Sequence, residues 1–250
     1  MNICLFSEDE ISRPLDMNDP RAVHIIRILH KNEGDSFYAG IIGGKSGTAV
    51  INRITGVMEF SFTPEGDGKP LSPLRMIIGI PRPIQLKRLL RDIAALGVAE
   101  VHLTGTELGE KSYMQSTLLE NNSTYKMLLD GTVQAASTHV PVLSVHRTLA
   151  DCLESLERAE PPSGNGLRLL LDNVRPQIHL SDCVRNFADS SAGNPVITAA
   201  VGSERGWTDR ERNFFAERGY ISCGMGERVM RTETAATVAG AIILSGMNWL

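Results

Sequence analysis

The chain has 250 residues, of which 42% are hydrophobic and 22% are charged, and its formal net charge is −4 at pH 7. These values are typical of a globular protein with one large domain or two smaller ones. No apolar run approaches the roughly 20 residues of a membrane-spanning helix, and the acidic start MNICLFSEDE is unlike a signal peptide. We therefore expect a cytoplasmic protein that does not bind a membrane.

The cysteines and histidines are scattered along the chain, and no C-x-x-C pair occurs. This dispersal predicts free thiols in a reducing compartment and no metal site. The negative net charge disfavours nucleic-acid binding by the chain as a whole. Residues 81–91 nevertheless form a local basic face, because four cations precede the first acid of that stretch. These cations are Arg82, Lys87, Arg88 and Arg91.

The first seventy residues are dominated by strand patterns. Strand-like runs occupy residues 2–6, 36–44, 48–56 and 57–64. The second and third runs flank a Gly-rich turn and predict a hairpin. Residues 19–34 form the one helical pattern here, with Pro20 near its start and Gly34 at its end. Proline and glycine in residues 64–73 then break every periodicity, so we divide the chain into domains 1–70 and 73–250.

Beyond this boundary, apolar runs alternate with amphipathic ones. The sequence predicts strands over residues 74–80, 99–104, 167–173, 195–202 and 220–225. It predicts helices over residues 83–97, 123–137 and 208–219 and a final helix in the second half of residues 224–244. Thr208 and Glu211 have the spacing of a capping box. Strands that alternate with helices indicate an α/β domain with a mostly parallel sheet.

Residues 201–207, VGSERGW, join a predicted buried strand to the capped helix. In open α/β sheets, ligands bind beyond the carboxyl ends of the strands. Glycines at both ends of the loop would let backbone amides approach a ligand closely. The alternative is an ordinary strand–helix turn whose charged side chains are solvated.

A group of charged residues stands directly before the final helix. It consists of Glu227, Arg228, Arg231 and Glu233. Thr232 or Thr234 could cap this helix, and Glu233 suits its positive end. A cation there costs about 0.3–1 kcal/mol unless an anion pairs with it. The arginines therefore either join a surface network with glutamates or point at an oxygen-rich ligand.

The loop GSERG, followed from residue 225 by MGERVMRTETAA, resembles the C-terminal signature of the bacterial 16S ribosomal RNA (uracil-N3)-methyltransferases. These enzymes belong to the SPOUT superfamily of knotted methyltransferases. The second loop matches the family pattern at Gly226, Arg228, Val229, Met230, Arg231, Glu233, Thr234 and Ala235. The stretch AVHIIRILHKNEGDSFYAG is similar to the small β-barrel domain of the family.

The resemblance implies a SPOUT domain with a parallel sheet and a C-terminal trefoil knot, preceded by a PUA-like β-barrel that holds RNA. It implies S-adenosylmethionine as the cofactor, small-subunit ribosomal RNA as the partner, and a homodimer. The cofactor-binding residues would be Asp172, Asn173, Gly202, Ser203, Glu204, Gly206, Met225, Gly226, Arg228, Val229, Met230 and Thr234. The RNA-binding residues would be His24, Arg27, Arg82, Lys87, Arg88 and Arg91.

Methylation of uracil N3 requires loss of the N3 proton, and the resulting charge spreads onto O2 and O4. On this reading Arg231 stabilises the developing anion, and Glu233 orients Arg231 or acts as the base. Glu204 is the other candidate base.

The chain departs from the family pattern at several positions. The first loop of the family usually reads Gly-Pro-Glu-Gly-Gly, whereas Ser203 and Arg205 replace the proline and one glycine here. Ala95 replaces a usual glutamate. Two alternatives therefore stay open: a divergent relative that methylates another RNA site, and a knotted RNA-binding protein without catalytic activity.

Overall fold

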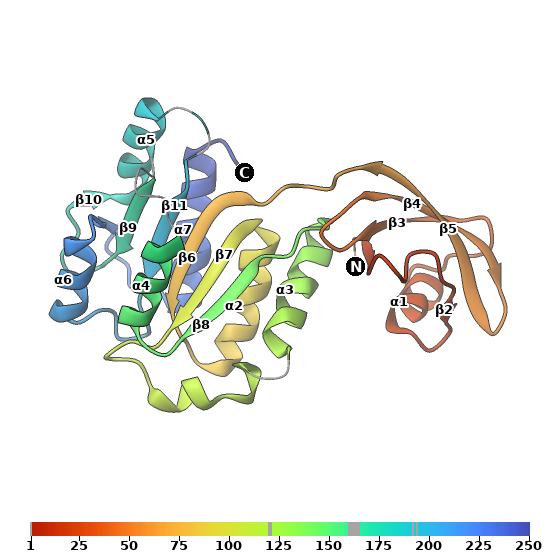
Figure 1. Ribbon diagram of the computed structural model, residues 1–250, viewed down its shortest axis with the longest axis horizontal. Helices are drawn as coiled ribbons and strands as arrows, with labels where there is room; N and C mark the ends of the chain where they lie inside the picture. The colour runs from red at the N-terminus through yellow and green to blue at the C-terminus, as the bar shows by residue number, and fades with distance from the viewer. Residues whose placement is uncertain (1, 120–121, 160–165, 192, 194) are drawn as a thin grey trace. The chain divides into compact units, whose positions relative to one another are not determined.

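The computed structural model describes residues 2–119, 122–159, 166–191, 193 and 195–250. The chain forms two compact units, drawn in Figure 1. One unit holds the chain up to Leu71 together with Leu129–Val140, and the other holds Ser72–Leu128 and Pro141–Leu250. The segment Leu129–Val140 returns to the first unit, a feature that the sequence does not predict.

The first unit is built on a five-stranded sheet with the order β1-β3-β4-β5-β2. The strands are β1 (Cys4–Phe6), β2 (Leu15–Asp16), β3 (Ser36–Ile41), β4 (Ser46–Ile54) and β5 (Val57–Gly66). The predicted hairpin is confirmed, since β3 and β4 pair antiparallel. Phe6, Ile25, Phe37, Ile51 and Met58 are among the buried side chains of its core.

The helical pattern of residues 19–34 forms a shorter element than predicted. Helix α1 (Pro20–Val23) continues as the π-helical turn η1 (His24–Ile28). Asp19 caps its start by accepting the Arg21 amide at 2.8 Å. The helix ends soon after residue 28, because the backbone of His30 turns to a φ of 53°.

The second unit contains a seven-stranded sheet with the order β10-β12-β9-β11-β6-β7-β8, and all neighbouring strands are parallel. The strands are β6 (Ser72–Gly79), β7 (Val98–Thr104), β8 (Val142–His146), β9 (Leu167–Leu171), β10 (Ile178–His179), β11 (Ile197–Val201) and β12 (Ile221–Gly224). The prediction of an α/β fold with a parallel sheet is confirmed. The sequence missed β8, which is half exposed, and β10, which has two residues.

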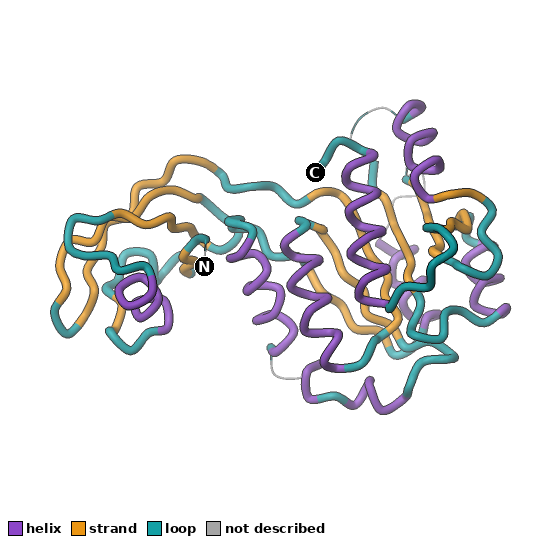
Figure 2. Tube along the Cα trace, turned by 180° about the vertical axis from the view of Figure 1, so that it is seen from behind, coloured by secondary structure: helices purple, strands orange, loops and turns teal. Residues whose placement is uncertain are grey.

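Helices cover both faces of this sheet (Figures 1 and 2). On one face lie α2 (Pro83–Ala95), α5 (Leu180–Ser190) and α7 (Thr232–Gly246). On the other lie α4 (Leu149–Ala159) and α6 (Asp209–Glu217). The chain also forms α3 (Ser123–Gln134) and the short 3-10 turns η2 (Lys111–Gln115) and η3 (Thr117–Leu119). Among the described residues, no helix is long and apolar enough to cross a membrane.

Helix α2 is amphipathic, and its pattern explains its bounds. Pro83 stands in its first turn, where the missing amide hydrogen costs nothing. Leu86, Leu89, Leu90 and Ile93 are buried against the sheet layer. Gly97 ends the helical segment with a φ of +77°, a conformation that favours glycine. The basic residues of this stretch consequently lie on the exposed face of the helix.

Helices α6 and α7 start in different ways. The predicted capping box of α6 is confirmed: the Glu211 amide donates to Thr208 Oγ1 at 3.1 Å, and the Thr208 amide donates to Glu211 Oε2 at 2.8 Å. The prediction that Thr232 or Thr234 caps α7 is wrong. Arg231 occupies the cap position without a side-chain hydrogen bond. Thr232 instead lies inside the helix and donates its hydroxyl to the Gly202 carbonyl at 3.1 Å.

Candidate active site

Three loops meet at the carboxyl ends of β9, β11 and β12. The first loop consists of residues 202–206, the second of residues 225–230 and the third of residues 172–174. Together they surround a cavity of about 270 Å³. Every predicted cofactor-binding residue except Thr234 lines this cavity. The fold therefore brings together segments that lie far apart in the sequence, at the sheet edge where ligands of α/β proteins bind.

The first loop, residues 202–206, is a tight turn that contains two glycines. The Gly206 amide donates to the Ser203 carbonyl at 2.9 Å, and Gly206 has a φ of +71°. A Cβ atom on Gly202 would lie 3.0 Å from the Gly206 Cα atom. A Cβ atom on Gly79, at the end of β6, would lie 2.5 Å from the Ser203 nitrogen. Space thus favours glycine at positions 79 and 202, and the positive φ favours it at position 206.

Ser203 stands where the resembled family usually has proline. Its side chain is buried, and its hydroxyl lies 2.9 Å from Thr106 Oγ1, which donates to it. The turn therefore keeps its tight geometry with serine at this position. It gains a hydrogen bond to the loop after β7.

The second loop leads from β12 into α7. Gly226 has a φ of +105°, which permits its turn. Val229 is 80% exposed, so an apolar side chain stands at the rim of the cavity. The bond from Thr232 to the Gly202 carbonyl fastens the end of this loop to the first loop.

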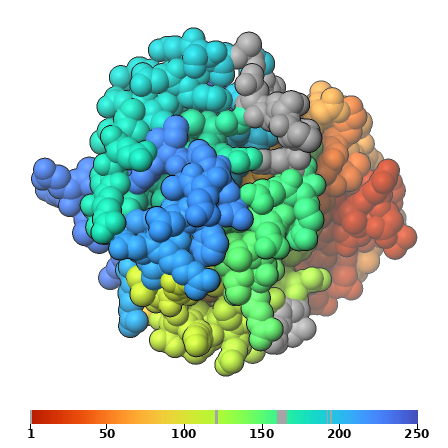
Figure 3. Space-filling view, turned by 60° about the vertical axis from the view of Figure 1, so that its left-hand side comes forward, coloured from red at the N-terminus to blue at the C-terminus, as the bar shows by residue number. Residues whose placement is uncertain are grey.

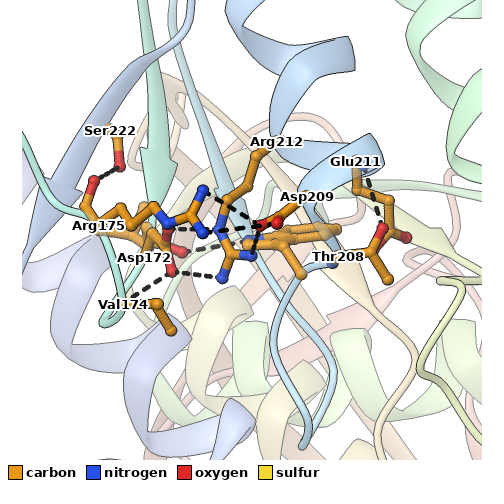
Figure 4. Close-up of polar contacts among 10 residues, drawn as sticks. Asp172, Val174, Arg175, Thr208, Asp209, Glu211, Arg212 and Ser222 are labelled. Carbon is orange, nitrogen blue, oxygen red and sulfur yellow. Dashed lines mark hydrogen bonds and ion pairs between the residues drawn. The ribbon is translucent and has the colours of Figure 1, made fainter.

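A buried ion pair supports the third loop (Figure 4). Asp172 accepts from Arg212 Nε at 2.7 Å and from Arg212 Nη2 at 3.1 Å. Asp172 Oδ1 also accepts the Val174 amide at 3.1 Å. Burial alone would raise the pKa of Asp172, but the bonds from Arg212 and the backbone outweigh it and hold that pKa below its usual value. The carboxylate is engaged by protein groups and shapes the loop.

The predicted catalytic residues occupy two environments. Glu204 is exposed and lines the cavity, and its Oε1 accepts the Arg82 amide at 2.9 Å. Arg231 is exposed at the start of α7. Glu233 is buried in the first turn of α7, and no described residue makes a hydrogen bond or ion pair with its carboxylate. Arg231 and Glu233 flank Thr232 but do not line the cavity themselves.

The predicted RNA-binding residues lie on both units. In the first unit, Arg27 is exposed, whereas His24 is half buried and its Nε2 atom has no hydrogen-bond partner among the described residues. In the second unit, Arg82 Nε donates to the Tyr113 hydroxyl at 3.1 Å. The other three cations are exposed on α2. They are Lys87, Arg88 and Arg91.

A second, larger cavity of about 800 Å³ lies on the α4 and α6 side of the sheet. Figure 3 shows the face where α6 (blue) lies beside the segment that follows β7 (yellow-green). Buried Glu211 joins these segments, because it accepts the Glu107 amide and the Thr208 amide, both at 2.8 Å. None of the predicted cofactor residues lines this cavity. We therefore assign the candidate site to the smaller cavity, where the glycine turns leave backbone exposed.

The sequence missed two residues that hold the site together. Arg212 anchors Asp172 from a helix forty positions along the chain. Thr232 bonds to a loop thirty positions earlier. No local pattern predicts either contact, because the first depends on how α6 packs beside the end of β9 and the second on how α7 packs beside the end of β11.

Comparison with known proteins shows the family of the chain. Residues 68–244 match the model of the RNA methyltransferase domain family. A Treponema pallidum protein named ribosomal RNA small subunit methyltransferase E is 36% identical over 99% of this chain and 92% of its own length. The chain belongs to this RNA methyltransferase family. A Borreliella burgdorferi member named ribosomal RNA small subunit methyltransferase E 1 is 29% identical over 97% of both chains.

Solved structures of methyltransferases share the fold of the whole chain. A Neisseria gonorrhoeae ribosomal RNA small subunit methyltransferase E bound to S-adenosyl methionine superposes with a TM-score of 0.75 at 20% identity, covering 98% of this chain and 97% of that one. A probable rRNA-methyltransferase from Porphyromonas gingivalis has the same TM-score at 19% identity and covers 99% of both chains.

The close approach of Gly79 to the first loop leads to a test. We expect Gly79→Ala to displace this loop, lowering the free energy of unfolding by about 1–3 kcal/mol and weakening S-adenosylmethionine binding about tenfold. Denaturant unfolding and calorimetry measure the two effects. Gly56→Ala is the control, because nothing lies within 4 Å of its added Cβ atom. Equal behaviour of the two variants would show that the contact does not constrain the loop.

The ion pair between Asp172 and Arg212 predicts a pH dependence of stability. Its contribution is fully present above the ordinary aspartate pKa of about 4 and is lost as pH falls through the lower folded-state pKa. We expect Asp172→Asn to cost about 3 kcal/mol at pH 7 and to flatten the loss of stability below pH ~4. Asp182→Asn removes an exposed pair with Arg185, so it should cost under about 1 kcal/mol. An unchanged acid profile in Asp172→Asn would contradict the assignment.

Proposed function

We propose that the chain transfers the methyl group of S-adenosylmethionine to N3 of a specific uridine in small-subunit ribosomal RNA. The observation that carries this proposal is the glycine-lined cavity at the carboxyl ends of β9, β11 and β12. The loops that line this cavity are those that resemble the family signature. Relatives of the chain are named ribosomal RNA small subunit methyltransferase E. The identity of the modified atom rests on the family resemblance of the second loop.

The residues of the cavity fit S-adenosylmethionine. Gly202, Gly206 and Gly226 add no side chains to the cavity wall, and both Gly206 and Gly226 have positive φ values. Backbone amides and carbonyls there can reach the polar edge of an adenine and a ribose. Met225, Val229 and Met230 supply apolar surface for the adenine ring. The bound cofactor would supply a methyl group already activated on a sulfonium.

The protein's part in the reaction is alignment and proton removal. We assign Arg231 to the oxygens of the uracil ring, because it is a solvent-exposed cation at the end of the second loop. A fixed guanidinium there would stabilise the charge that develops as the N3 proton leaves. Buried Glu233 would orient Arg231 or accept the proton. Glu204 would be the other base, and its bond to the Arg82 amide already holds its carboxylate at the cavity.

The remaining structural assignments belong to the same proposal. We assign residues 1–70 to a PUA-like, barrel-type RNA-binding domain and residues 73–250 to the SPOUT methyltransferase domain. The five-stranded sheet of the first unit supports the former. We also propose a trefoil knot in the C-terminal part, on the family resemblance; residues 225–230 line one cavity together with the loops after β9 and β11. We further propose a cytoplasmic homodimer.

The exposed cations of α2 would contact RNA phosphates. Lys87 and Arg88, together with Arg91, lie on one exposed helix face, which suits contact with a backbone and carries no sequence information. In the first unit, His24 and exposed Arg27 would add to RNA binding. Sequence selection would then fall to the site around the target uridine.

A second candidate function is RNA binding without catalysis. The replacements Ser203 and Arg205 in the first loop favour it, since they depart from the family pattern. Calorimetry with S-adenosylmethionine separates the two functions. Binding supports the methyltransferase, and no detectable binding supports the RNA-binding protein.

The role of Arg231 gives the main test of the mechanism. We expect Arg231→Ala to slow methyl transfer from labelled S-adenosylmethionine to unmodified small ribosomal subunits by about a hundredfold or more. Cofactor affinity should stay within a few-fold of wild type, because Arg231 does not line the cavity. Arg185→Ala, an exposed change on α5, is the control and should leave turnover intact. Unchanged turnover in Arg231→Ala would remove this residue from the mechanism.

The basic face of α2 predicts a salt effect. A double variant, Lys87→Ala with Arg88→Ala, should lower the slope of log K against log salt concentration by about 1.5, since each lost phosphate contact contributes about 0.7–0.9. Filter binding to ribosomal RNA at several salt concentrations measures this slope. Arg158→Ala, an exposed change on α4, should leave it unaltered. The same slope in wild type and double variant would exclude these contacts.

A further inference from the structure

Two histidines and a cysteine converge in the second unit, away from the three signature loops. His102 lies on β7, and His146 is the last residue of the neighbouring strand β8. Cys152 lies near the start of α4, which packs on the same side of these strands. His102 Nδ1 lies 3.0 Å from His146 Nε2, and the ligand atoms of all three residues lie within 4.8 Å of one another.

The spacing of these atoms is close to that of a metal site. Two histidine nitrogens on one tetrahedral zinc ion lie about 3.3 Å apart, given zinc–nitrogen distances of about 2.0–2.1 Å. The sulfur of a third ligand lies about 3.6 Å from each nitrogen. The separation of 3.0 Å between the two histidines therefore needs to widen only by a few tenths of an ångström. The Cys152 sulfur lies within 4.8 Å of both nitrogens.

A second layer of polar groups orients the first histidine. His102 Nε2 lies 3.3 Å from Glu100 Oε2, and Glu100 in turn accepts from Arg75 Nε at 2.9 Å. Histidine ligands of zinc commonly give their other ring nitrogen to a carboxylate, which fixes the tautomer and raises the basicity of the ligating nitrogen. Here the carboxylate at Nε2 leaves Nδ1 of His102 as the ligating atom, facing His146.

Two of the three side chains are shielded from solvent. Cys152 is fully buried, and His102 is 7% exposed. His146 is half buried, so it leaves an entry path from solvent. Two imidazole nitrogens and one thiolate are a donor set that zinc and other thiophilic divalent ions prefer over magnesium or calcium.

We infer that His102, His146 and Cys152 form a binding site for a thiophilic divalent metal ion, with zinc as the best match. No fourth His, Cys, Asp or Glu of the described residues joins the group, so water would complete a tetrahedral coordination. The ion would fasten β8, an outer strand of the sheet, and α4 to β7. The sequence predicts no metal here, because the two histidines stand 44 positions apart.

The alternative is that the two histidines share a hydrogen bond, with a proton between their nitrogens in place of the ion.

The test is titration of the metal-free full chain with Zn²⁺ alone, with binding measured by calorimetry and by native mass spectrometry. We expect one equivalent to bind. A zinc concentration of about 100 times Kd should raise Tm by about 5–10 °C. Titration with Co²⁺ should add a thiolate-to-cobalt charge-transfer band.

Variants assign the binding to these side chains. Cys152→Ser should abolish the charge-transfer band and the Tm increase. His146→Gln, at a half-buried position, should weaken zinc binding at least about tenfold. This variant tests the site if Cys152→Ser does not fold. Cys183→Ser is the matched control, since Cys183 is also a buried cysteine but lies outside the group. It should bind zinc as wild type does. Absence of zinc binding by wild type, or undiminished binding by both group variants, would overturn the inference.

Discussion

Close contact of backbone with backbone at the carboxyl ends of β6 and β11 is the constraint on which the site depends. Gly79 leaves no space for a Cβ atom beside the Ser203 nitrogen, and Gly202 leaves none beside Gly206. Because the strands are parallel, all of these ends reach the same edge of the sheet. The loops can then surround one cavity, to whose wall Gly202, Gly206 and Gly226 contribute backbone.

Two polar contacts hold the loops around the cavity in place. Thr232 joins the start of α7 to Gly202, and Arg212 holds Asp172 at the end of β9. Each contact links a cavity loop to another element, so the cavity keeps its shape without a disulfide or a long hydrophobic insert. Arg231, which no capping rule explains, is exposed at the start of α7 and available for substrate. That division of labour underlies the assignment of Arg231 and Glu233 to the reaction.

Local chemistry predicts the elements of this fold better than their contacts. The capping box of Thr208 and Glu211 and the stop at Gly97 depend on nearby residues, and both occur as predicted. Threonine is a residue type that commonly caps helices, but Thr232 donates its hydroxyl to a residue thirty positions earlier, because the parallel sheet brings Gly202 close to it. The grouping of His102, His146 and Cys152 likewise arises only when β7, β8 and α4 pack together. The residues around the cavity were found through family resemblance, since spacing alone left an ordinary turn open.

Identification of the methylated nucleoside distinguishes methylation of uracil N3 from methylation of any other atom. Small ribosomal subunits that lack the modification would be incubated with the full chain and S-adenosylmethionine carrying a labelled methyl group. The RNA would then be digested and its nucleosides separated. The account predicts label in N3-methyluridine from a single position of the small-subunit RNA. Label on a ribose or on another base, or none at all with a folded, cofactor-binding protein, would contradict it.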